Sequence, residues 1–216
     1  MTIGRALRRI NPAAGWALPA NTAVALYSNH TTGGGLWEDQ SGNGNHATLV
    51  GGTLTEADGL ATSSTKYASI AQTPTLTAGG IVCAWVKPNS TSGNPLILGA
   101  WTGATEYLLA QYGTMGAAGY NNIQKGIAGA LSAGTWTHLA LLFTGTHVYC
   151  YADGSASASG ASGSISSSQA VYLGRQAPGA SYKFDGQIDG LFFVTSGGDE
   201  EMVLDFMDNA PGSHAA

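Results

Sequence analysis

The chain has 216 residues, of which 44% are hydrophobic and only 10% are charged, whereas charged residues make up roughly 25% of ordinary soluble domains. This length fits one domain of the all-β kind, and a surface so poor in charge has to consist largely of Gly, Ser, Thr, Asn and Ala. The formal net charge of −5 argues against nucleic acid or an anionic membrane as the partner of the main body.

Residues 1–23 predict a basic N-terminal arm. Its basic residues and aromatic anchor are Arg5, Arg8, Arg9 and Trp16. Asn11-Pro12 follows the basic residues where a signal peptide needs an apolar run, so no signal peptide is expected. No apolar run is long enough for a membrane span either. Two interpretations stay open: the arm lays an extra strand on its own domain, or it docks on a neighbouring subunit.

From residue 24 onward the pattern predicts one strand after another. Residues 81–87 form a β-rich run that ends at a proline. The runs at 95–101 and 106–112 predict one hairpin, and those at 136–143 and 148–151 predict a second.

Three further features follow along the chain. Asp153-Gly154 predicts a type I′ turn, because both central residues of that turn need positive φ. The Ser/Ala/Gly-rich stretch 155–168 is either a mobile loop or a plain edge strand. Apolar residues at helical spacing predict a short amphipathic helix over 200–209, with Ser196 or Asp199 as its cap.

The chain has only two cysteines, Cys83 and Cys150. Two are too few for a disulfide framework. Both lie in apolar, strand-like runs, which predicts two buried free thiols. A bridge would require the two strands to be neighbours.

Residues 36–48 form a loop that is rich in oxygen ligands. Its polar and glycine residues are Asp39, Ser41, Gly42, Asn43, Gly44 and Asn45. The glycines allow a tight curl, and carboxylate, amide and carbonyl oxygens suit Ca²⁺. The loop begins like an EF-hand, but Val50 stands where that motif needs Glu, so a second carboxylate must come from elsewhere. The alternative is a plain turn in which Asp39 caps backbone amides.

Asp189 lies within the apolar, strand-like segment 184–194, although aspartate is disfavoured in strands. A carboxylate in that position needs a partner. The partner could be a backbone amide. It could also be the cation at Asp39, whose loop needs one more carboxylate to complete the set of ligands.

Six short motifs follow one another in a specific order. They are Trp37-x-Asp39-x-Ser41-Gly42-Asn43-Gly44-Asn45-His46, Ala84-Trp85-Val86-Lys87-Pro88, Trp136-Thr137-His138-Leu139-Ala140, Tyr151-Ala152-Asp153-Gly154, Leu173-Gly174-Arg175 and Phe184-Asp185-Gly186-Gln187-Ile188-Asp189. Together they resemble the laminin-G-like, concanavalin A-like lectin/glucanase superfamily over residues 24–208. The remaining residues are then the arm, 1–23, and a C-terminal tail, 209–216.

The resemblance implies an all-β fold, in which two antiparallel sheets pack as a jelly-roll sandwich with one concave sheet, followed by a short C-terminal helix. It also implies a structural Ca²⁺ shared between the opening loop and the last strand. The expected ligands are the carboxylates of Asp39 and Asp189 and the amide or carbonyl oxygens of Asn43 and Asn45.

An enzymatic role is not expected. The glucanases of this superfamily resemble one another in a strand motif of Glu, any residue, Asp, two residues, Glu, and they use paired carboxylates. The nearest segment here, residues 56–61, lacks the final acid. Neither cysteine has a histidine beside it, no Gly-x-Ser-x-Gly elbow is present, and the five histidines show no zinc spacing.

Two non-catalytic functions remain. In the first, the domain is a stand-alone carbohydrate-binding module, and the candidate stacking residues are Trp101, Tyr107, Tyr112 and Tyr120. Each of these could instead be a core residue, and Tyr107 and Tyr112 cannot face the same way if they share a regular strand.

In the second, the chain is a structural subunit that resembles bacteriophage virion proteins displayed on capsids or tail fibres. Its arm would then contact other virion subunits, and a lectin-like domain could still bind glycans. This second interpretation is preferred, with the protein located in a virion; the alternative location is extracellular.

Overall fold

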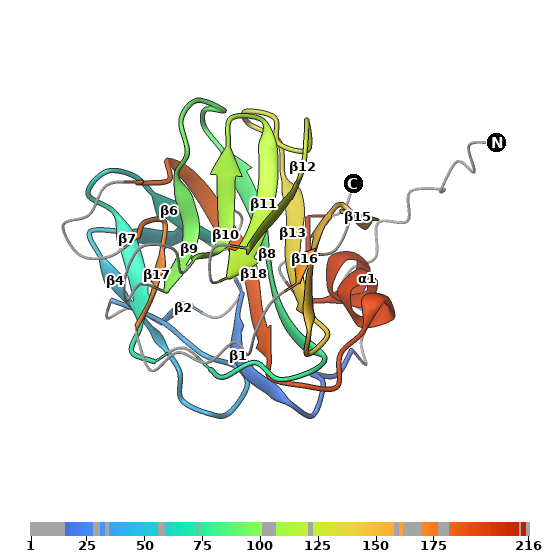
Figure 1. Cartoon of the computed structure of the whole chain (residues 1–216). Helices are drawn as coiled ribbons and strands as arrows, with labels where there is room; N and C mark the ends of the chain where they lie inside the picture. Colours follow the sequence, from blue (N-terminus) through green and yellow to red (C-terminus); the bar gives the residue numbers. More distant parts are fainter. Residues whose placement is uncertain are drawn as a thin grey trace.

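The structure is a computed structural model that describes residues 16–27, 31–32, 35–55, 59–72, 74–100, 107–120, 123–157, 160–161, 170–176, 182–211 and 213–214. Two antiparallel sheets face each other, and a short helix follows the last strand (Figure 1). This architecture confirms the predicted all-β jelly-roll sandwich with a short C-terminal helix. Among the residues described, no helix has the length and apolar character that a membrane crossing requires.

Sheet A contains the two longest strands of the described chain at its centre. Its main path runs β15-β14-β13-β8-β18-β6-β5, with β1 paired to β18 and β16 paired to β14. The strands are β1 (Thr22–Leu26), β5 (Thr53–Thr55), β6 (Gly59–Thr62), β8 (Gly80–Pro88), β13 (Thr137–Phe143), β14 (His147–Ala152), β15 (Ser155–Ala156), β16 (Gly160–Ala161) and β18 (Gly186–Val194).

Sheet B covers the other side of the sandwich. Its strand order is β12-β11-β10-β9-β17-β7-β4-β3-β2. The strands are β2 (Thr31–Thr32), β3 (Leu36–Trp37), β4 (Ala47–Val50), β7 (Tyr67–Ile70), β9 (Leu96–Ala100), β10 (Tyr107–Tyr112), β11 (Met115–Tyr120), β12 (Ile123–Ile127) and β17 (Val171–Leu173).

The main core fills the space between the sheets. Because side chains alternate along a strand, one half of each central strand faces this core. On β18 the inward residues include Ile188, Leu191 and Phe193, whereas Phe192 and Val194 point to the opposite face. A bulge at Gly190, which has a φ of 53°, shifts the alternation by one residue.

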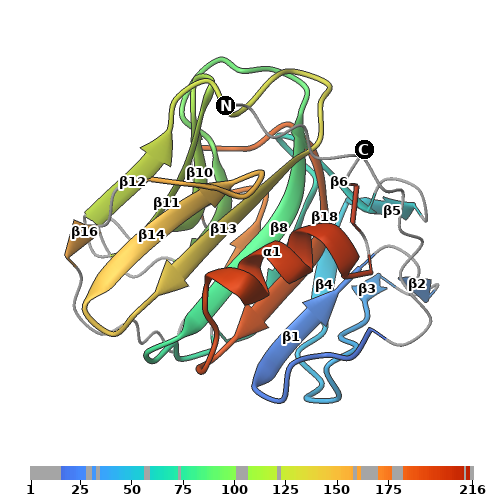
Figure 2. The same ribbon diagram turned by 90° about the vertical axis from the view of Figure 1, so that its right-hand side faces the viewer.

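The helix α1 (Glu200–Asn209) covers part of the outer face of sheet A, where Figure 2 shows it lying across β8 and β18. Val203 and Phe206 pack there against Phe192 and Val194. The helix has the predicted bounds. Of the two predicted caps the structure uses Asp199, whose Oδ1 accepts a 3.0 Å hydrogen bond from the backbone N–H of Met202.

We predict that Asp199→Ala lowers the free energy of unfolding by about 1 kcal/mol, because the backbone N–H of Met202 then loses its partner at the start of the helix. Asp199→Ser keeps an oxygen in capping position and should stay near the wild-type value. Urea denaturation of both variants tests this. Equal stability of the two variants would show that the cap contributes nothing.

Three other local predictions are confirmed. The strands β9 and β10 pair as one hairpin, and β13 and β14 pair as the other. Asp153 and Gly154 both have positive φ, 45° and 75°, and join β14 to β15. Cys83 and Cys150 are buried free thiols. They point to opposite faces of sheet A, since Cys150 lies in the main core and Cys83 under the helix.

Trp16 bears on the two interpretations that the sequence leaves open for the N-terminal arm. Its indole Nε1 donates a 2.8 Å hydrogen bond to Asp205 Oδ2, and its ring packs edge-on against Phe192 and Phe206 at 5.8 Å. Trp16 therefore anchors the chain to its own domain. Its ring covers part of the apolar outer face of sheet A. The predicted boundary at residue 23 falls inside β1. Arg5, Arg8 and Arg9 lie outside the described residues.

Candidate functional site

The loop at residues 39–45 closes the edge of β1 that faces away from β18. Three of its groups donate to carbonyls of that strand: Gln40 N to Ala25 O at 2.8 Å, Asn43 Nδ2 to Thr22 O at 2.9 Å and Asn45 Nδ2 to Ala23 O at 2.8 Å. Gly42 and Gly44 have φ values of 84° and 74°, so the predicted curl at the glycines is confirmed. The loop takes the place of a further strand.

The carboxylate of Asp39 accepts four hydrogen bonds within this loop and from β1. Oδ1 receives the backbone N–H groups of Ala25, at 2.9 Å, and Ser41, at 3.0 Å. Oδ2 receives Ser41 Oγ at 2.7 Å and Asn45 N at 2.9 Å. An ionised carboxylate has about four lone-pair positions, and protein donors use all of them. As arranged, this carboxylate does not fit a cation, and it acts as the amide cap that was the alternative interpretation.

Asp189 does not join Asp39, which corrects the predicted shared site. Ala25 pairs with Phe192 of β18, yet its N–H points to Asp39. Strand β1 therefore lies between Asp39 and β18, and strands in a sheet are about 4.8 Å apart. Asp189 has its own partners: the N–H of Gly190 at 2.8 Å and Nε2 of His214 at 3.0 Å. Within the described ranges no three His, Cys, Asp or Glu residues gather as metal ligands.

We predict that excess chelator leaves the melting temperature unchanged, because the loop is held by protein donors. A structural Ca²⁺ at about 100 times its Kd would contribute roughly 2.7 kcal/mol. Thermal scans with EDTA and with added CaCl₂ decide between the two. A clear rise in melting temperature with CaCl₂ would restore the calcium prediction.

Of the four predicted aromatic residues, only the side chain of Tyr112 lies in the described part of the structure. Tyr112 is half-buried and packs against Leu96, Ala110 and Ala117, a small cluster that is separate from the main core. Trp101 lies outside the described residues. Tyr107 and Tyr120 belong to β10 and β11, but their side chains are outside the described part.

A different aromatic group lies on the outer face of sheet B. Val171 and Leu173 of β17 and Ala68 of β7 point into the main core. By strand alternation, Tyr172 and Tyr67 point outward. The register supports this, because Tyr172 is opposite Ser69, which also points outward. We call Tyr67, Ser69, Tyr172 and Arg175 the tyrosine platform.

The two tyrosine rings of the platform lie close together. Their centroids are 6.3 Å apart with an interplanar angle of 47°. The Arg175 guanidinium carbon lies 4.4 Å from the Tyr67 ring centroid, within cation–π range. Both tyrosines are half-buried, whereas Arg175 is buried. The platform thus places two partly exposed tyrosine rings and Ser69 on the outer face of sheet B, with Arg175 over one of the rings.

A glycine fixes the position of Arg175. A Cβ at Gly99, which is opposite Tyr172, would lie 2.9 Å from the backbone oxygen of Arg175. The turn after β17 therefore folds down onto β9 only because position 99 has no side chain.

The exposed apolar side chains of Leu36 and Val50 extend the outer face of sheet B, because they pair with the outward Thr48 and Tyr67. The sequence analysis did not identify the tyrosine platform. The alternation of Tyr172 with the apolar Val171 and Leu173 is a signal that could have shown it.

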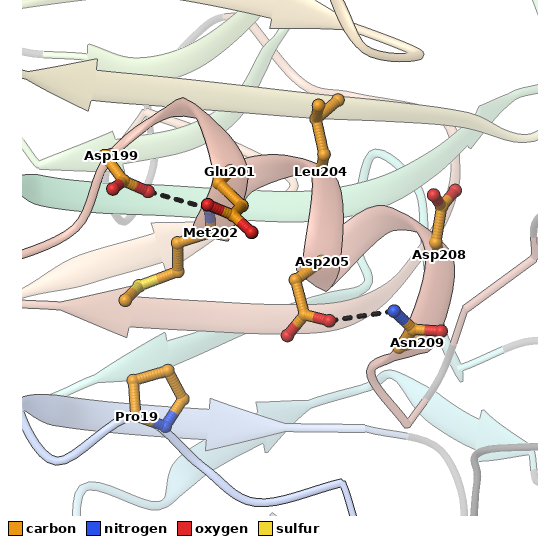
Figure 3. A pocket seen from close by; sticks show the side chains of 8 residues that line it. All are labelled: Pro19, Asp199, Glu201, Met202, Leu204, Asp205, Asp208 and Asn209. Carbon is orange, nitrogen blue, oxygen red and sulfur yellow. Dashed lines mark hydrogen bonds between the residues drawn. The ribbon is translucent and has the colours of Figure 1, made fainter.

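A second feature is an open pocket of about 490 Å³ beside α1 (Figure 3). Its lining includes four acidic residues, Asp199, Glu201, Asp205 and Asp208. Two of these already have structural roles, since Asp199 caps the helix and Asp205 binds Trp16 and the side chain of Asn209. The pocket is therefore a poorer candidate than the platform.

Solved structures share this fold at low sequence identity. Trypanosoma rangeli sialidase in complex with sialic acid has a TM-score of 0.69 and 14% identity, over 93% of this chain and 35% of the sialidase. Domain 4 of AbnA, an extracellular arabinanase from Geobacillus stearothermophilus in complex with arabinotriose, has a TM-score of 0.62 and 18% identity, over 86% of this chain and 98% of that domain. This chain thus spans about a third of the sialidase but nearly all of the arabinanase domain.

A botulinum neurotoxin type C structure, described by its interaction with two ganglioside molecules, has a TM-score of 0.65 and 10% identity. The match covers 85% of this chain and 50% of the toxin chain. These likenesses concern the fold. No curated protein matches the sequence.

A family model for laminin-G-like domains matches residues 62–195, which run from β6 to the end of β18. This match, together with the two-sheet fold, confirms the resemblance found in the motifs. The chain belongs to the concanavalin A-like lectin/glucanase superfamily.

Proposed function

We propose that this protein is a non-catalytic carbohydrate-binding domain and that the tyrosine platform is its sugar-binding surface. The observation that carries the proposal is the pair of outward, neighbouring rings of Tyr67 and Tyr172 on a rigid sheet. Apolar faces of sugar rings stack on such aromatic surfaces, while hydroxyl and charged groups at the edge fix their orientation.

The position of the platform supports binding by a preformed surface. Tyr67 and Tyr172 are held by neighbouring strands in the middle of sheet B, and Arg175 is held by the turn after β17. Little ordering is then needed on binding, which favours affinity.

The residues of the platform also support a binding role over hydrolysis. Glycosidases of the usual kind need two carboxylates that flank the scissile bond. Tyr67, Ser69, Tyr172 and Arg175 include no carboxylate. The structural neighbours bound to sialic acid and arabinotriose indicate which sugars to use first as probes.

We predict that Tyr172→Ala weakens oligosaccharide binding at least about tenfold, which corresponds to roughly 1.4 kcal/mol, because half of the aromatic surface is lost. Tyr172→Phe keeps the ring and should retain most of the affinity. A glycan array identifies the best ligand, and calorimetry with that ligand compares the variants. Equal affinity of Tyr172→Ala and wild type would refute the platform as the binding surface.

The finer part of the proposal is that this domain is displayed on a phage virion and reaches glycans from there. The basic arm with Arg5, Arg8 and Arg9 supports it. The test is to delete residues 1–15, which leaves the Trp16 anchor in place, and to measure incorporation into particles. We expect a folded domain that no longer assembles. Normal incorporation of the truncated chain would argue for the stand-alone module.

A further inference from the structure

A row of three side chains crosses the centre of sheet A on its outer face. Trp85 of β8 is opposite His138 of β13 on one side and Asp189 of β18 on the other. All three are buried, and the row lies beside the part of the face that α1 covers. The positions of these three side chains are therefore fixed by central strands of the sheet.

The chain places its own His214 against this row. Nε2 of His214 lies 3.0 Å from Asp189 Oδ2. The imidazole ring stacks on Trp136 with a centroid distance of 3.8 Å and an interplanar angle of 9°, and it meets Trp85 edge-on at 6.0 Å. The ring therefore has an aromatic face on one side, a second ring at its edge, and a carboxylate at one nitrogen.

The buried carboxylate of Asp189 needs a hydrogen-bond donor, and the imidazole of His214 supplies one. Asp189 has no exposed surface, and within the described structure its carboxylate is hydrogen-bonded to the N–H of Gly190 and to the imidazole of His214. An ionised carboxylate cannot donate, so Nε2 carries the proton of this hydrogen bond. Without the imidazole N–H, Asp189 would keep one backbone donor for a buried charge, which is unfavourable.

Two further polar groups along the row lack partners. Trp85 Nε1 and His138 Nδ1 are buried, and neither has a hydrogen-bond partner among the described residues. Buried polar atoms are paired in most native structures. Trp85 borders the His214 ring and His138 borders Trp85, so this region has hydrogen-bonding groups that His214 does not use.

His214 comes from the segment after α1, whereas Trp85 and Asp189, which contact it, belong to the central strands β8 and β18. His214 follows α1, and the approach is held by Ser213, whose Oγ donates to Met207 O at 2.6 Å and whose N–H donates to Ala210 O at 3.1 Å. A segment held by a few local hydrogen bonds opens more easily than the central strands of a sheet. A preformed site with a locally attached occupant is therefore a site that can exchange its ligand.

We propose that Trp85, Trp136 and Asp189 form a binding site for an imidazole ring, which His214 fills from within the chain and which accepts a free imidazole ligand when His214 is absent. The ligand class is a flat five-membered ring with one N–H donor in its plane. The recognition consists of stacking on Trp136 and hydrogen bonding to Asp189. This site is separate from the tyrosine platform, which lies on sheet B.

The test is chemical rescue of the full chain carrying His214→Ala. Imidazole should raise the melting temperature of this variant in a saturable way and leave wild type unchanged. N-methylimidazole, at a pH that keeps the free ring neutral, has no N–H and should not rescue. The double variant with Asp189→Asn, and a second one with Trp136→Leu in case the first does not fold, should lose the response to imidazole.

Two results would overturn the proposal. The first is a folded His214→Ala chain whose melting temperature does not respond to imidazole. The second is an equal response in wild type or in both double variants, which would mark a nonspecific solvent effect. A measurement on wild type is independent of these variants: stacking on Trp136 should shift the ring protons of His214 upfield in NMR spectra, and Trp136→Leu should remove that shift. Unshifted protons in wild type would contradict the geometry of the site.

Discussion

Replacement of Asp39 by alanine should lower the free energy of unfolding by about 3 kcal/mol. The carboxylate accepts four hydrogen bonds from Ala25, Ser41 and Asn45, of which the one from Ala25 is buried and the others partly so, and removal of a charged acceptor leaves these donors without their partner. The loop would then lose a hydrogen bond to the edge of β1, the strand that pairs with the end of β18. For a domain of this size, the melting temperature should fall by roughly 6–12 °C.

Asp39→Asn is the sharper variant of this experiment. An amide would direct two N–H donors at groups that are themselves donors, so we expect a loss similar to that of alanine. Asp208→Asn on α1 serves as the control, since exposed or half-buried substitutions away from such networks usually change stability by less than about 0.5 kcal/mol. A wild-type melting temperature for Asp39→Asn would mean that the hydrogen bonds of this carboxylate do not hold the loop.

The second large effect is a loss of stability in mild acid that depends on His138. Its ring is buried, and burial lowers the pKa of His138 from 6.5 to about 3. The unfolded chain therefore binds more protons than the folded chain between these two values, and stability falls as the pH drops through this window. Between pH 7 and pH 5 the loss from this residue alone is about 2 kcal/mol.

Nearby groups have to be separated from this effect. Burial raises the pKa of Asp153, whose carboxylate accepts the backbone N–H of His138, so its contribution has the opposite sign. His138→Gln keeps that backbone contact and removes the titrating ring. We expect denaturation curves at pH 7 and pH 5 to differ by about 2 kcal/mol less in this variant than in wild type. The same pH dependence in both proteins would show that His138 protonates without opposing the fold.

The fold could be predicted because its evidence is local and ordered along the chain. The apolar runs of β8 and β13, the Asp153-Gly154 turn and the helix capped by Asp199 each follow from neighbouring residues. The order of six motifs then identified the superfamily, since a sandwich of this kind sets which motif precedes which. Here local preference and tertiary packing agree.

The sites could not be predicted to the same extent, because they depend on which strands are neighbours. The sequence shows two unusual acids, Asp39 and Asp189, and the simplest hypothesis joins them. The structure puts β1 between them and gives Asp189 to His214, a residue that no periodicity marks. The tyrosine platform likewise joins β7 to β17, which are distant along the chain.

The most direct test of the central claim locates bound sugar on the labelled protein by NMR. Titration with the best oligosaccharide from the array should shift the backbone amide signals of Tyr67, Ser69, Tyr172 and Arg175 first, and Tyr172→Ala should remove these changes. Shifts confined to α1, to the loop at residues 39–45 or to the imidazole site at Trp136 would contradict the claim that the tyrosine platform binds the sugar.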